Sequence, residues 1–154
     1  MKMKIAAATV LTSLLWTACS MAKPVAPLRV ELGSAFKLPV GGSAQIGDGI
    51  LRVGVDAVLN DSRCPKGEQC VWAGDATVRV WLQQASGPRQ ALDLRLMANT
   101  GPTPQALGYQ IRLLRLEPEA VSGKAIAPGD YLATLELKSA EAEGRNVPNV
   151  APDR

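Results

Sequence analysis

Residues 49–57 read Gly-Ile-Leu-Arg-Val-Gly-Val-Asp-Ala, and residues 76–83 read Ala-Thr-Val-Arg-Val-Trp-Leu-Gln. In both stretches apolar and polar side chains alternate, which is typical of β-strands with one buried face. The first stretch presents one apolar face, made by Leu51, Val53, Val55 and Ala57. The second presents another, made by Ala76, Val78, Val80 and Leu82, and leaves Trp81 on the polar side. These two predicted strands indicate an all-β fold.

Three further stretches have the same period of two. Their apolar positions are Leu92, Leu94 and Leu96; Tyr109, Ile111 and Leu113; and Tyr131, Ala133, Leu135 and Leu137. Leu114 and Leu116 fall out of phase with Leu113, which predicts a β-bulge or a strand that passes between two sheets. The regular spacing of strands and turns favours an antiparallel β-sandwich of the immunoglobulin type, with a small β-barrel as the alternative.

The segment between the first two predicted strands contains Cys64 and Cys70, separated by Pro-Lys-Gly-Glu-Gln. Pro65 and Gly67 supply turn chemistry, so a local disulfide is expected in an oxidising compartment. Redox-active pairs of the thioredoxin type have two intervening residues, whereas five intervene here. A tetrahedral zinc site would need two ligands more. We therefore expect a structural disulfide and no metal site.

The disulfide should hold the residues that it encloses as a rigid protruding knuckle suited to binding a partner. The candidate binding residues are Arg63, Lys66, Gly67, Glu68, Gln69 and Trp72. Two of them have a structural alternative, which we favour. Arg63 would pair with Asp61 or Glu68 and order the turn. Trp72 would pack on the disulfide as a core cap, with Gly74 bending the chain inward, instead of standing exposed as an anchor.

The chain contains no histidine, which removes Ser-His-Asp and Cys-His catalytic machinery. Ser122 and Lys124 could form a nucleophilic pair in principle, but they lie between proline-containing segments and are interpreted as loop residues. Asp56 and Asp61 are interpreted as solvated carboxylates. We expect a protein that is not an enzyme and has no cofactor.

The N-terminus predicts export. Lys2 and Lys4 precede an apolar run that ends at Trp16, so residues 1–22 are interpreted as a signal peptide. Cleavage after Ala22 is one alternative. The other resembles a bacterial lipobox, Leu-Trp-Thr-Ala-Cys, in which Cys19 would be acylated. The expected location is periplasmic, or membrane-anchored through Cys19.

The remaining chain is predicted to form one β domain at residues 23–140, followed by a flexible tail at residues 141–154. Without residues 1–22, which contain two lysines and no acidic residue, 15 basic residues remain against 14 acidic ones. A nearly neutral chain without a basic stripe in its sequence is not expected to bind nucleic acid.

The segments Asp61-Ser-Arg-Cys-Pro65 and Cys70-Val-Trp-Ala-Gly74 resemble the signature of a family of small bacterial exported proteins, many of them with lipoprotein signals. Gly108-Tyr109 and Gly129-Asp-Tyr131 extend the resemblance over most of the domain. The resemblance implies export and no particular activity.

These features together predict a non-catalytic binding module of the cell envelope, lipid-anchored and holding an envelope protein or a cell-wall component. The alternative is an inhibitor-like protein that places the rigid loop 64–70 in the active site of a secreted peptidase.

Overall fold

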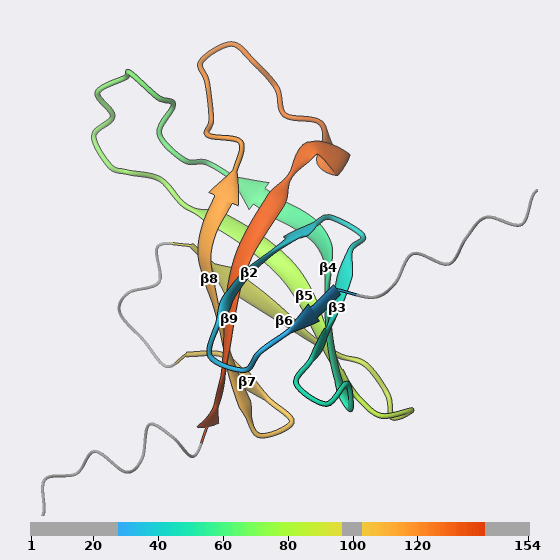
Figure 1. Ribbon diagram of the computed structural model, residues 1–154. Helices are drawn as coiled ribbons and strands as arrows, with labels where there is room; N and C mark the ends of the chain where they lie inside the picture. The colour runs from blue at the N-terminus through green and yellow to red at the C-terminus, as the bar shows by residue number, and fades with distance from the viewer. Residues whose placement is uncertain (1–27, 97–102, 141–154) are drawn as a thin grey trace, which may run out of the picture.

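The computed structural model describes residues 28–96 and 103–140, which form two β-sheets packed face to face (Figure 1). The predicted signal peptide, Cys19 and the predicted tail at 141–154 lie outside the described residues. The strands are β1 (Leu28–Val30), β2 (Ala35–Pro39), β3 (Ser43–Ile46), β4 (Leu51–Asp61), β5 (Ala76–Gln84), β6 (Gln90–Arg95), β7 (Gln105–Ala106), β8 (Tyr109–Glu117) and β9 (Leu132–Ser139).

The larger sheet has the strand order β1-β3-β4-β5-β6, and the smaller sheet has the order β2-β9-β8-β7. The all-β prediction is confirmed, and the described strands form a sandwich-like pair of sheets with no closed barrel. One pairing departs from the predicted antiparallel arrangement, because β1 runs parallel to β3. The chain leaves the larger sheet after β1, forms β2 in the smaller sheet and returns as β3.

The core between the sheets is mainly aliphatic. Val53, Val78, Val80, Leu82 and Leu135 have no exposed surface, and the other predicted inward positions of β5 and β9 are also buried. Phe36 and Leu38 of β2 complete this core from a strand that the alternation did not identify. Burial of each large aliphatic side chain contributes about 1.5–3 kcal/mol, so the two alternating faces supply the main folding force.

A β-bulge in β8 explains the change of phase along this strand. The register between β8 and β9 shifts between Leu113 and Arg115. As a result Leu113 and Leu116 both face the core, whereas 46% of Leu114 is exposed. The predicted bulge is confirmed, and β8 stays within one sheet.

Trp81 lies on the outer face of the larger sheet, as predicted, yet only 5% of it is exposed. The indole ring occupies the space above Gly54, where the neighbouring strand has no side chain. The Arg89 guanidinium covers the ring, with its central carbon 4.0 Å from the ring centroid. A tryptophan on a polar face is thereby shielded from water by a glycine and an arginine.

The segments 62–75 and 118–130 form two long loops at the same end of the sandwich, at the top of Figure 1. The only helix in the described ranges is the 3₁₀ turn Pro128–Asp130. Accordingly, these ranges contain no helix of the length and apolarity needed to cross a bilayer.

Replacing Gly54 with alanine should destabilise the protein by about 2 kcal/mol, because the new methyl group would overlap the Cε2, Cζ2 and Nε1 atoms of Trp81. Denaturant unfolding measures this change. Gly129→Ala is the matched control, since its Cβ would meet nothing within 4 Å, and it should shift stability by less than about 0.5 kcal/mol. Equal effects of the two substitutions would contradict the packing role of Gly54.

Candidate functional site

The loop 62–75 continues the pairing of β4 with β5 beyond the ends of both strands. The Ser62 amide donates to the Asp75 carbonyl over 2.8 Å, and the Cys64 amide donates to the Ala73 carbonyl over 2.9 Å. Gly74 has a φ of +73°, and a Cβ there would overlap the Ser62 carbonyl. Glycine therefore lets the two arms approach closely and form a narrow, hydrogen-bonded neck.

An ion pair between Asp61 and Arg63 fixes the neck to the smaller sheet. The Arg63 Nε donates to Asp61 Oδ1 and its Nη2 to Asp61 Oδ2, both over 2.7 Å. The same guanidinium donates to the carbonyls of Leu116 and Pro118, at the end of β8. The Tyr131 hydroxyl donates to Asp61 Oδ2 over 3.1 Å. Five residues from three distant parts of the chain meet in this network.

The network is largely withdrawn from water, since the exposed fractions of the Arg63 and Asp61 side chains are 12% and 10%. Hydrogen bonds from Arg63 hold the pKa of Asp61 below its usual range. The same pair raises the pKa of Arg63, and burial with the Asp61 hydrogen bond raises that of Tyr131. This geometry agrees with the favoured interpretation, in which Arg63 pairs with Asp61 and orders the turn.

The ring enclosed by the disulfide contacts the second long loop. The Lys66 amide donates to the Ala120 carbonyl over 2.8 Å, and its Nζ lies 3.0 Å from Glu119 Oε2. Both side chains of the ion pair are largely exposed, so the backbone bond is the firmer link. Lys66 therefore lies at the junction of the two loops.

The structure contains the predicted disulfide between Cys64 and Cys70, with the two Cα atoms 5.9 Å apart. Inside the ring the Glu68 amide donates to the Pro65 carbonyl, and Gly67 has a φ of +86° that suits this turn. A ring of seven residues lowers the entropy of the unfolded chain by an equivalent of about 2.4 kcal/mol. Glu68 and Gln69 are exposed at its tip, as expected for a knuckle.

Trp72 is not a core cap, and this favoured interpretation is wrong. Its exposed fraction is 65%, and the adjacent Val71 is fully exposed at 106%. The expectation assigned Gly74 to turning the ring inward, but Gly74 serves the close approach of the two arms at the neck. The two apolar side chains consequently stand in solvent just outside the disulfide ring.

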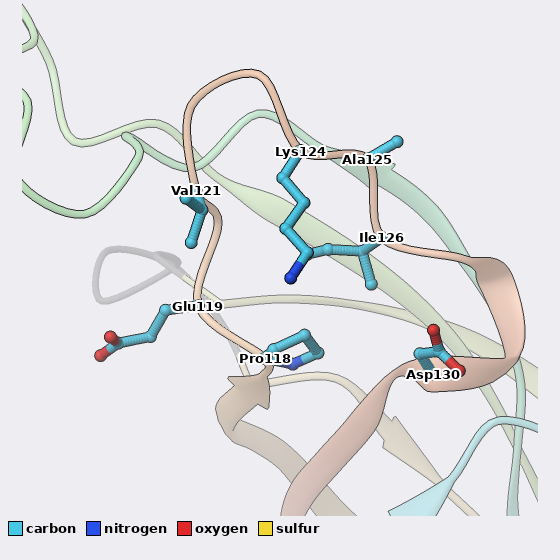
Figure 2. A pocket seen from close by; sticks show the side chains of 7 residues that line it. All are labelled: Pro118, Glu119, Val121, Lys124, Ala125, Ile126 and Asp130. Carbon is cyan, nitrogen blue, oxygen red and sulfur yellow. The ribbon is translucent and has the colours of Figure 1, made fainter.

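The second loop contains a shallow pocket of about 180 Å³, lined by Pro118, Glu119, Val121, Lys124, Ala125, Ile126 and Asp130 (Figure 2). Figure 2 shows the side chains of Lys124 and Ile126 extending between the two arms of the loop. The volume is below the roughly 300–1,000 Å³ of typical small-molecule sites. Ser122 is not part of the lining, so the pocket does not assemble a Ser122–Lys124 pair.

The described residues contain no group of three or more His, Cys, Asp or Glu side chains that could hold a metal ion. What the loop end presents is an exposed apolar pair on a rigid base, beside the polar residues 66–69. Sequence reasoning missed Val71 and Tyr131. The apolar pair Val71-Trp72 in a polar loop was a usable signal for Val71, and the need of a buried tyrosine hydroxyl for a partner was one for Tyr131.

Asp61→Asn should lower the free energy of unfolding by about 2 kcal/mol at pH 7, because it leaves part of the Arg63 network without its charged acceptor. The folded-state pKa of Asp61 lies below 3.8, so its contribution is complete above about pH 4 and is lost as the pH falls through that folded-state value.

Denaturant unfolding between pH 2 and pH 7 measures the effect. The difference between the wild type and Asp61→Asn should be constant near neutrality and shrink below about pH 4. Asp93→Asn is the control, because its partner Arg79 is exposed and the pair contributes little. A pH-independent difference for Asp61→Asn would contradict the assignment.

Comparison of the chain with protein-family models, with curated proteins and with solved structures finds no match. The family resemblance of the cysteine-containing loop thus remains an expectation. A function for this chain has to be argued from the loop end and from the surface of its sheets.

Proposed function

We propose that this protein is a non-catalytic, exported interaction module of the cell envelope that binds a partner protein with the loop 62–75. The observation that carries the proposal is the 65% exposure of Trp72 on a loop whose base is fixed. Partially exposed tryptophans often anchor protein interfaces, because they bury a large area at low entropic cost.

The rigid base makes the loop suited to binding. The disulfide, the neck hydrogen bonds and the Arg63 network hold the segment on both sides of Trp72. Binding then loses little backbone freedom, which raises affinity for a given contact area. Lys66, Glu68 and Gln69 would form the polar rim around the Val71-Trp72 pair.

Export and the membrane anchor belong to the proposal as well. The Cys64–Cys70 disulfide supports an oxidising compartment, since such bonds rarely persist in the cytosol of most organisms. Acylation of Cys19 would tether the module to a membrane. The family resemblance and the missing histidines further favour a protein that binds without catalysis.

A peptidase-inhibitor-like function is a second candidate, favoured by the preorganised ring between Cys64 and Cys70. An inhibitor loop has to keep its shape in the active site, and the Lys66–Ala120 hydrogen bond helps to do so here. Under this alternative, residues 65–69 enter a peptidase cleft and Trp72 packs beside it.

Trp72→Ala should weaken partner binding roughly 30-fold, the loss expected for an interface anchor worth about 2 kcal/mol. Folding stability should change by less than about 0.5 kcal/mol because the ring is exposed. The measurement is affinity capture from envelope extract, with quantification of each captured protein, followed by titration of the purified partner. Ile50→Ala is the matched control, since Ile50 is 51% exposed before β4, at the opposite end of that strand. Equal capture by Trp72→Ala and wild type would refute the proposal.

The two candidates differ in their response to changes in the ring. Replacing residues 65–69 with Gly-Ser-Gly-Ser-Gly should abolish stoichiometric inhibition of a secreted peptidase if the protein is an inhibitor. If it is a general interaction module, a panel of envelope peptidases should keep full activity at equimolar wild-type protein. Residual activity measured against a titration of the protein separates the two outcomes.

A further inference from the structure

Five polar side chains form one row across the outer face of the larger sheet. The register pairs Arg29 of β1 with Gln45 of β3, Gln45 with Arg52 of β4, and Arg52 with Gln83 of β5. Arg89 stands one position beyond the last register pair of β5 and β6, which places it beside Gln83. The row therefore alternates Arg-Gln-Arg-Gln-Arg, and we name it the arginine row.

The spacing of the row follows from sheet geometry. Adjacent strands lie about 4.8 Å apart, so arginines on alternate strands are separated by about 10 Å at their Cα atoms. The residues next to the row along each strand, such as Ala44, Val53 and Leu82, point to the opposite face of the sheet and are buried in the core. The alternation of a strand then directs the row outward, and Arg29 and Arg89 are exposed.

Trp81 organises two of the three arginines. The Arg89 central carbon lies 4.0 Å and that of Arg52 lies 5.9 Å from the indole centroid. Guanidinium groups stacked on an aromatic ring keep their N–H edges available for an oxyanion. Because Trp81 is itself held above Gly54, the ring provides a fixed support for these cations.

The three arginines of the row have no carboxylate partner in the part of the chain that the structure describes. By contrast, Arg79 and Arg95 on the same sheet are paired with Asp93 and Asp75. A line of three arginines without acidic partners favours the binding of a negatively charged ligand.

We propose that the arginine row binds a linear acidic polysaccharide whose carboxylates or other oxyanions recur on alternate sugar units. The arginines would hold the anionic groups, and the amide oxygens of Gln45 and Gln83 would accept hydrogen bonds from hydroxyls between them, since Gln83 Nε2 already donates to the Gly87 carbonyl. The proposed binding surface is separate from the loop 62–75. The row crosses β4 near its first residues, at Arg52, whereas the loop follows its last residue, Asp61.

The arrangement of charges favours a single polymer chain over a membrane surface. Asp56 and Asp93 lie on the same face, farther along β4 and β6, and both are exposed. Asp93 is paired with Arg79, so the described face beyond the row offers an anionic bilayer no unpaired cation there and places Asp56 against it, whereas a polymer that follows the row would avoid Asp56. Single-stranded nucleic acid is disfavoured as well, since it needs exposed aromatic rings for base stacking and Trp81 is covered.

The test is isothermal titration calorimetry with the purified protein and hyaluronan oligosaccharides, which have a carboxylate on every second sugar. We expect saturable binding that weakens with salt. The triple variant Arg29→Gln/Arg52→Gln/Arg89→Gln should bind roughly 30-fold more weakly, as the sum of three exposed ionic contacts. The double variant Arg29→Gln/Arg52→Gln, which keeps the Arg89 stack, should show an intermediate loss if the triple variant fails to fold.

The matched control is Lys37→Gln/Arg115→Gln/Lys138→Gln, which removes the same charge from the smaller sheet and should bind like the wild type. Trp72→Ala should also bind normally, so failure of the loop proposal and failure of this one can be distinguished. Equal weakening by both triple variants would overturn the proposal, as would absence of binding. Equal or tighter binding to single-stranded DNA, or to vesicles containing 30 mol% phosphatidylglycerol, would overturn it too.

Discussion

The ion pair between Asp61 and Arg63 is the interaction on which the loop end of this protein depends. Asp61 is the last residue of β4 and Arg63 follows it by two positions. The guanidinium also binds the carbonyls at the end of β8, and Tyr131, directly before β9, donates to the carboxylate. A buried pair is favourable only when its remaining donors and acceptors are satisfied. Here two carbonyls and a hydroxyl supply those partners, so the charges that close the loop also join the two sheets.

The disulfide and this network act on different parts of the same segment. The covalent bond shapes the ring of residues 64–70, whereas Arg63 fixes the position of the ring relative to the smaller sheet. Trp72 lies between the ring and the neck, so its backbone is restrained from both sides while its side chain remains in solvent. Exposing a tryptophan side chain to water is unfavourable. Because the base of the loop is already rigid, Trp72 can bind a partner surface without the entropic cost of ordering the loop.

The sequence predicted most of the core because alternation is a direct consequence of strand geometry. The inward positions of β5 and β9 were predicted residue by residue, and the phase change at Leu114 revealed the bulge. The short strands β1 to β3 show too few periods for this signal, and the parallel pairing of β1 with β3 depends on a crossover that periodicity does not encode.

The candidate site was less accessible to sequence reasoning for a physical reason. Arg63 donates to two backbone carbonyls at the end of β8, and Asp61 accepts a hydrogen bond from Tyr131. These partners lie more than fifty positions away along the chain, so no local spacing in the sequence records them. The direction of the Trp72 side chain depends on whether the core has room for it.

The edges of the two sheets have a consequence for how this protein can recognise anything. β1 and β7, each at one edge of its sheet, have only three and two residues, and β2 at another edge contains Lys37 and Pro39. Short strands, charges and proline leave few backbone groups at these three edges to which another chain could add a strand. The fourth edge, β6, has six residues and is, among the described strands, the one place where strand addition has room. Away from β6, recognition must then proceed through side chains, so specificity there can change by single substitutions while the hydrogen-bonded framework stays intact.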